Sequence, residues 1–206
     1  SMLTITSDQT DPQSVPITLN VSGESNSLSL PFIDISTSDN GIVDLPVEVN
    51  PLFSAVAERY THILAPNGEA VPIIAQGNIT DHQLLHVRKI LEEYLRDVPG
   101  TQWGNNKDPV FNALALSNAI LFLLNDESQY NNPDLVALFD AGAIGQDLLA
   151  TEILPEGTNV YMNSELRDAS FEEILHFVHG YGIQNALPSM QTAVMQALTN
   201  AISNDN

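Results

Sequence analysis

The sequence contains no cysteine. A chain without thiols cannot form a disulfide, provide a thiolate nucleophile or bind zinc through sulfur. Cysteine-based catalysis and cysteine zinc fingers are therefore excluded. Any metal site would have to be built from histidine and carboxylate side chains.

Positive charge is scarce. The chain has 6 Lys and Arg residues against 26 Asp and Glu residues, which gives a net charge of −20. Such a surface repels phosphate groups and anionic lipids, so nucleic acid is not an expected partner. The charge favours solubility, cations and basic partners instead.

A long apolar run is also missing. No stretch reaches the roughly 20 apolar residues that cross a bilayer, so membrane insertion is not expected, and no signal peptide is present. The opening Ser1-Met2 is typical of residues left by cloning, which would also have removed a leader. The expected location is therefore secreted or periplasmic. A helical pattern runs directly into residues 203–206, which indicates that the natural protein continues.

What the chain does contain is enough for one good-sized domain. It has 206 residues, of which 43% are hydrophobic. Residues 1–50 are rich in Ser, Thr, Asp, Asn and Pro, with apolar alternating runs at 15–21, 28–35 and 42–49. These runs predict strands, and their prolines favour edge strands or extended peptide. We interpret residues 1–50 as a β-rich arm or small appendage, or alternatively as a linker from a larger secreted protein.

Residues 51–206 have a firmer pattern. Residues 60–65 and 70–75 predict a hairpin across the turn signal Asn67-Gly68. Thr80 and Gln83 have the spacing of a capping box and predict the start of a helix. The apolar stripe that follows ends before Pro99-Gly100.

Further elements complete this region. Asp108 as cap and Pro109 at the first position predict a buried helix over 108–124, which is apolar nearly all round. We expect a short helix over 133–141, a second hairpin from 148–154 and 158–162, and a last helix over 188–202. Strands and helices without strict βαβ alternation predict an α+β fold.

One segment concentrates the residues that carry chemistry. It holds Glu172, Glu173, His176 and His179 within a helical pattern. At 3.6 residues per turn, Glu172, His176 and His179 fall within about 60° of one another. Carboxylate and imidazole are ligands that zinc accepts.

The run from Glu172 to His176 has the spacing of the zinc-protease motif His-Glu-x-x-His, with glutamate in place of the first histidine. An apolar extended segment that ends at Met162 precedes it. Residues 60–183, with their order of helix, buried helix, strands and motif helix, therefore resemble the catalytic half of a zincin metallopeptidase.

The resemblance implies zincin-like helices packed on a small mixed sheet and a peptide or protein substrate. It makes Glu172 and His176 zinc ligands and Glu173 the general base that activates water. Zincins need a third ligand. His179 or an upstream group is one source for it, and a residue beyond Asn206 is another.

A purely structural interpretation accounts for the same residues. With Ser170 as N-cap, Glu173 would close a capping box. The negative charge of Glu172 near the helix N-terminus and a positive charge on His179 near the C-terminus would each stabilise the helix through its macrodipole. The corresponding function is a non-catalytic acidic surface or binding module.

Other clusters carry weaker signals. His82 and His86 have the zinc spacing, but Gln83 stands where a general base is needed. Oxygen-rich turns at 39–44 and 105–108 make calcium a candidate ligand of the binding module, although neither has the EF-hand spacing. Nothing in the sequence indicates an oligomeric state.

Overall fold

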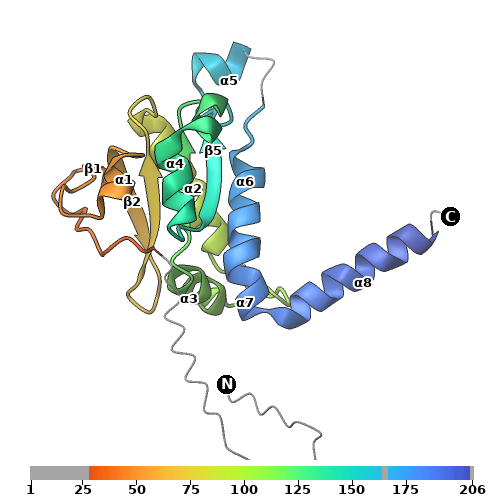
Figure 1. Ribbon diagram of the computed structural model, residues 1–206. Coiled ribbons are helices and arrows are strands. Elements are labelled where there is room, and N and C mark those ends of the chain that lie inside the picture. Colours follow the sequence, from red (N-terminus) through yellow and green to blue (C-terminus); the bar gives the residue numbers. More distant parts are fainter. Residues whose placement is uncertain (1–27, 164–166, 205–206) are drawn as a thin grey trace, which may run out of the picture.

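The computed structural model describes residues 28–163 and 167–204 (Figure 1). A five-stranded mixed sheet has the order β1-β2-β3-β4-β5. Strands β1 to β3 are antiparallel, and β3 to β5 are parallel. The strands are β1 (Val43–Asp44), β2 (Arg59–Leu64), β3 (Ala70–Ala75), β4 (Ile120–Leu124) and β5 (Gly145–Leu149). The predicted α+β class with a mixed sheet is confirmed.

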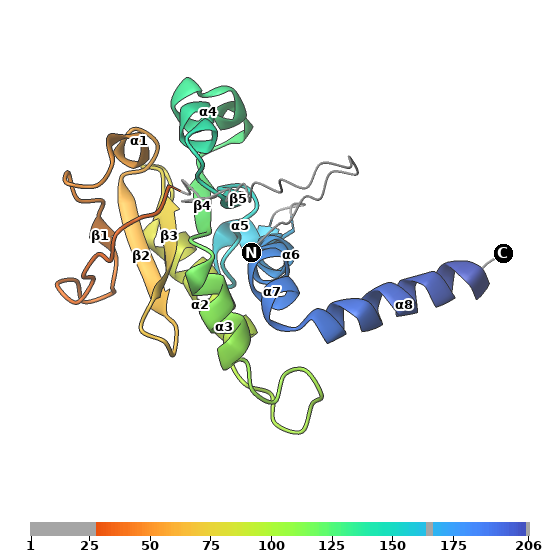
Figure 2. The same ribbon diagram turned by 60° about the horizontal axis from the view of Figure 1, so that its bottom comes forward.

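Helices cover both faces of this sheet (Figures 1 and 2). One face carries α2 (Asp81–Leu95), α3 (Asp108–Leu116), α6 (Ser170–Phe177) and the π-helical turn η2 (Val178–Ile183). The other face carries α1 (Pro51–Ser54) and α4 (Pro133–Asp140). The remaining helical elements are η1 (Glu127–Asn131), α5 (Asn159–Asn163), α7 (Gln184–Ala186) and α8 (Pro188–Asn204).

The sheet separates two apolar clusters. Ile73, Leu121 and Leu148 face α2, α3 and α6, whereas Tyr60 and Phe122 face α1 and α4. The connection from β3 to β4 and the connection from β4 to β5 step in the same direction across the sheet but pass on opposite faces. They therefore have opposite hands, and one of the two is the rare left-handed crossover.

The described part of the predicted arm packs on this same sheet. Ile33, Leu45 and Val49 are buried in the cluster with α1 and α4. Residues 28–35 form no strand, and residues 42–49 contain only β1, in keeping with Pro31 and Pro46, which lack the N–H that a ladder requires. The predicted strand at 15–21 lies outside the described residues, and the division at residue 50 stays an interpretation.

Locally encoded elements were predicted well. In the β2–β3 turn Gly68 has φ +87, and the Ala65 N–H donates to the Glu69 carbonyl at 2.9 Å. Thr80 and Gln83 form the predicted capping box of α2. The last helix is α8, and the helix predicted over 133–141 is α4.

The buried helix was predicted too long. The helix expected over 108–124 ends at Leu116, and residues 120–124 form β4 instead. Its N-cap is Lys107, not Asp108. Asn118 has φ 59, which breaks the helix, and a short apolar run is equally compatible with a buried helix and a buried strand.

The second predicted hairpin was also wrong. The strand is β5, which pairs with β4, and residues 159–163 form α5. The turn at 155–157 does form, with Gly157 at φ +84. Beyond it Thr158 Oγ accepts the Tyr161 N–H at 3.2 Å, a helix-capping bond that favours α5 over a strand.

The close approach of β5 to β4 requires glycine at position 145. A Cβ on Gly145 would collide with the Ile120 carbonyl oxygen and lie 2.7 Å from the Phe122 ring. We expect Gly145→Ala to lower the free energy of unfolding by about 2–3 kcal/mol, measured by urea denaturation. Gly180→Ala is the control, because its Cβ would meet nothing within 4 Å. Equal stability of the two variants would contradict this packing.

Candidate functional site

The residues predicted to bind zinc lie along α6 and η2 but point to different partners. Glu172 and His176 are exposed. His179 Nε2 lies 2.8 Å from Gln191 Oε1 of α8. Glu173 Oε2 accepts a hydrogen bond from Gln146 Nε2 at 2.8 Å and lies 3.5 Å from His176 Nδ1.

Only Glu173 and His176 of this set are brought together. Within residues 28–163 and 167–204, no group of three or more His, Asp or Glu side chains is placed to hold a metal ion. Protein zinc sites have three or four protein ligands. The zinc and calcium assignments therefore stay predictions.

The predicted capping box of α6 does not form. Ala169 is the N-cap, without a side-chain capping bond, and Ser170 is buried in the first turn. The Ser170 N–H is instead accepted by Asp168 Oδ1 at 3.2 Å. Asp168 therefore takes the capping role that the sequence suggested for Ser170.

The surroundings of Glu173 disfavour the charged form of its carboxyl group. Burial raises its pKa; His176 lowers the pKa, and the negative charges of Glu152 and Glu172 raise it further. The net shift is upward. A raised carboxyl pKa is a property of general bases, although structural groups also show it.

The second histidine motif, which contains His86 and Gln83, links α2 to the segments that follow β5 and precede α6. His86 Nε2 lies 2.7 Å from Asp168 Oδ2, which joins α2 to the start of α6. Gln83 Nε2 donates to the carbonyls of Ala150 and Ile153 at 2.9 and 3.1 Å. Burial acts to raise the pKa of Asp168, but hydrogen bonds from His86, Ser170 and the Leu154 N–H bring it below its ordinary value. Asp168 is a residue that the sequence analysis missed, because its partner lies far away along the chain.

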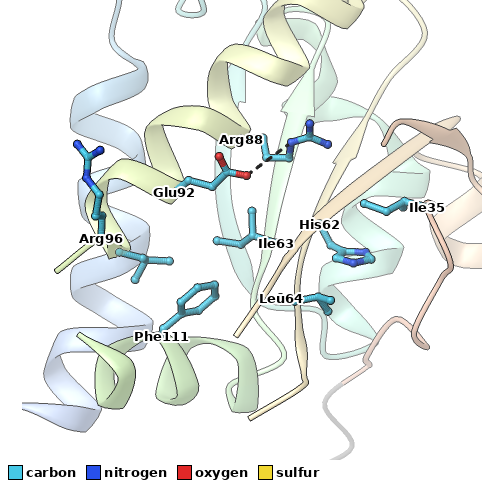
Figure 3. A pocket seen from close by; sticks show the side chains of 9 residues that line it. Ile35, His62, Ile63, Leu64, Arg88, Glu92, Arg96 and Phe111 are labelled. Carbon is cyan, nitrogen blue, oxygen red and sulfur yellow. Dashed lines mark ion pairs between the residues drawn. The ribbon is translucent and has the colours of Figure 1, made fainter. Parts of the chain in front are cut away.

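A different feature is the outer edge of β2, which is only partly paired. β1 pairs only with Arg59 and Tyr60. Among the residues that the structure describes, no strand pairs with Thr61 to Leu64 on that side. A hollow of about 530 Å³ lies along this edge (Figure 3). Its lining residues are Ile35, His62, Ile63, Leu64, Arg88, Glu92, Leu95, Arg96 and Phe111.

The hairpin register shows which backbone groups face the hollow. Ala65 and Glu69 form a hydrogen-bonded pair, and such pairs alternate along antiparallel strands. The peptide groups of His62 and Leu64 therefore point outward, away from β3. His62 lies opposite Pro72, which has no N–H to offer, and this agrees with the alternation. Leu64 is 53% exposed.

His62 places an unsatisfied nitrogen at this edge. The residue is 5% exposed, and Nδ1 has no hydrogen-bond partner among the described residues. The ring packs against Phe32 and Tyr60, with centroids 5.4 and 5.6 Å away. Burial lowers the pKa of His62, the Arg88 charge lowers it further, and Asp34 opposes both. The imidazole is therefore neutral at pH 7.

The lining is basic relative to the rest of the protein. Arg88 and Arg96 are two of the six Lys and Arg residues, and Glu92 is the one acidic residue in the lining. Arg88 is fixed by bonds to Thr61 Oγ at 2.9 Å and the Asn40 carbonyl at 3.0 Å. Arg96 is 71% exposed and pairs with Glu93. Figure 3 shows Ile63, Glu92 and Phe111 on one side of β2 and His62 and Ile35 on the other.

The opposite edge of the sheet is closed by side chains. The Tyr181 hydroxyl donates to the Gly145 carbonyl at 3.1 Å. The Glu152 carboxylate accepts the Leu149 N–H at 2.7 Å. Proteins usually block exposed strand edges, which invite pairing with other chains. The open part of β2 therefore contrasts with the blocked edge of β5.

No protein-family model, curated protein or solved structure matches the chain. Within the described residues no helix is both long and apolar enough to span a bilayer.

The neutral state of His62 predicts a pH dependence of stability. The unfolded chain takes up a proton near the ordinary pKa of 6.5, whereas the folded chain does so only at a lower pH. Stability is therefore lost as pH falls from about 6.5 towards the folded pKa. We expect His62→Phe to unfold less readily than the wild type at pH 5 in urea, followed by circular dichroism.

The exposed His82→Gln is the control and should follow the wild-type pH profile. At pH 7 His62→Phe should be at least as stable as the wild type, because it removes a buried nitrogen without a partner. An unchanged pH profile in His62→Phe would show that the imidazole does not resist protonation.

Proposed function

We propose that this protein is a non-catalytic binding module that accepts an extended peptide as an added strand on β2. The observation that carries the proposal is the hollow beside the outward-facing peptide groups of His62 and Leu64. A peptide laid along this edge would exchange backbone hydrogen bonds with those groups, as in other cases of strand addition. The backbone would provide affinity without regard to sequence.

Side chains around the hollow would select the peptide. Ile35, Leu95 and Phe111 offer apolar contact, and Arg88 and Arg96 offer positive charge. The two arginines lie on the face that α2 and α3 cover, together with Leu95 and Phe111, whereas Ile35 lies on the other face. Because successive side chains of a strand point to opposite faces, a peptide that alternates acidic and apolar residues can direct its acidic side chains to the arginines and its apolar side chains to Ile35. Charge complementarity favours an acidic peptide, although the chain as a whole carries −20.

A metallopeptidase is the second candidate. It is supported by Glu173, whose pKa is raised, and by His176 at 3.5 Å from it. Mass spectrometry of native protein purified without chelator tests this function. One equivalent of zinc, lost in His176→Ala and kept in His82→Ala, would favour the peptidase over the binding module.

The binding function predicts an effect of charge reversal in the hollow. The probe is an acetylated eight-residue peptide that alternates valine and glutamate, titrated at 0.15 M salt by calorimetry. We expect Arg96→Glu to weaken binding about tenfold, because it removes an attraction and adds a repulsion. Lys89→Glu is the matched control, since Lys89 is exposed on α2, close to Arg96 at its C-cap, and does not line the hollow.

N-methylation of the probe separates strand addition from simple charge attraction. A methyl group on every second amide removes the donors along one edge of the peptide. Two such peptides can be made, one methylated on the odd-numbered amides and one on the even-numbered amides. One of them should lose binding, and the other should bind as the unmethylated probe does. Equal binding of both methylated peptides, or equal loss in Arg96→Glu and Lys89→Glu, would overturn the proposal.

A further inference from the structure

Helix α8 projects from the body of the protein. Figures 1 and 2 show it leaving the domain after α7. Its main contacts with other elements are to α7 and η2, where Gln191 bonds with His179 at 2.8 Å. Beyond this base, Val194, Met195 and Leu198 are each about half exposed, at 47%, 51% and 51%.

The composition of α8 is unlike that of the rest of the chain. Residues 174–204 contain no Asp, Glu, Lys or Arg, although charged residues make up 16% of the sequence. At 100° per residue, Met190, Val194, Leu198 and Ile202 follow one another on one face, with Ala197 and Ala201 beside them. Thr192, Gln196, Thr199 and Asn200 occupy the other face.

A solitary helix of this kind needs a surface to pack on. Most helical stability in proteins comes from packing an apolar face rather than from the helix propensity of the residues. α8 has no charged pairs along its surface to compensate. Its apolar face is therefore expected to be covered in solution.

We propose that the apolar face of α8 packs against α8 of a second copy of the chain, in antiparallel orientation. The absence of charge is the main argument. On a protein of net charge −20, this is the surface where two copies can meet without placing like charges in contact. A lipid surface is a poorer fit, because interfacial helices carry Lys and Arg on their polar face.

The sequence of the apolar face suits a two-fold axis. Val194 and Ile202 lie four residues before and after Leu198. An antiparallel pair centred on Leu198 places Leu198 against its own copy and each Val194 against Ile202, as a two-fold interface requires. The small side chains of Ala197 and Ala201 allow the two helices to approach closely.

The geometry also separates the acidic bodies. Leu198 lies ten residues beyond Pro188, the base of α8. At 1.5 Å per residue the two bases of an antiparallel pair would stand about 30 Å apart. The Debye length at physiological salt is about 8 Å, so repulsion between the bodies would be largely screened.

Sedimentation equilibrium of the full chain from 5 to 500 µM, values chosen to cover weak association, tests the proposal. We expect the average mass to rise from one copy to two with concentration. Leu198→Glu places two like charges on the axis and should weaken dimerisation at least tenfold. Gln196→Glu makes the same charge change on the polar face and should dimerise as the wild type does.

The absence of cysteine permits a second test of the register. Under oxidising conditions Leu198→Cys should give a disulfide-linked dimer, and Gln196→Cys should give much less, because only position 198 meets its own copy. A chain that stays monomeric at 500 µM and cross-links equally at both positions would overturn the proposal. Binding of the monomer to zwitterionic phosphatidylcholine vesicles, lost in Leu198→Glu, would assign the face to lipid and also overturn it.

Discussion

The structure depends on the burial of strand β4. All five of its residues, Ile120 to Leu124, are buried, and their side chains enter both apolar clusters. Burying a large apolar side chain contributes about 1.5–3 kcal/mol, so this strand alone accounts for roughly 10 kcal/mol of gross stabilisation. That is comparable to the net stability of a whole domain, which is about 5–15 kcal/mol. The helices on either face pack on the two apolar clusters to which this strand contributes.

The two edges of the sheet differ in how far their backbone groups are hydrogen-bonded. Tyr181 and Glu152 occupy backbone groups of β5 with side-chain hydrogen bonds. β2 is covered over two of its six residues and then left open beside Arg88 and Arg96. The open part of this edge lies beside two of the six Lys and Arg residues of an acidic protein, and the proposed binding function rests on this combination.

The sequence was informative where a structure is decided locally. The hairpin turn at Gly68 and the capping box of Thr80 and Gln83 depend on residues a few positions apart, and both were predicted. β4 was mistaken for helix because burial on two faces removes the alternation that distinguishes a strand. Its identity depends on β3 and β5, which are distant in sequence.

The candidate sites follow the same division. Spacing placed Glu172, Glu173 and His176 on one helix, but spacing says nothing of Gln146, which bonds to Glu173 from β5. The open edge of β2 could not be predicted from the sequence, since it arises where a neighbouring strand stops short. The scarcity of basic residues was a usable signal, because Arg88, Lys89 and Arg96 all fall within one stretch of α2 and its C-cap.

Dimerisation through α8 would raise the avidity of the proposed peptide binding. Two paired copies would carry two β2 edges on one particle, so that a ligand with two acidic segments would bind the second at a high effective concentration. The bodies would be joined at points about 30 Å apart, and an extended chain covers about 3.3 Å per residue. The length of chain between the two segments would therefore decide whether one ligand can occupy both edges, and α8 would set that length by fixing where the two bodies stand.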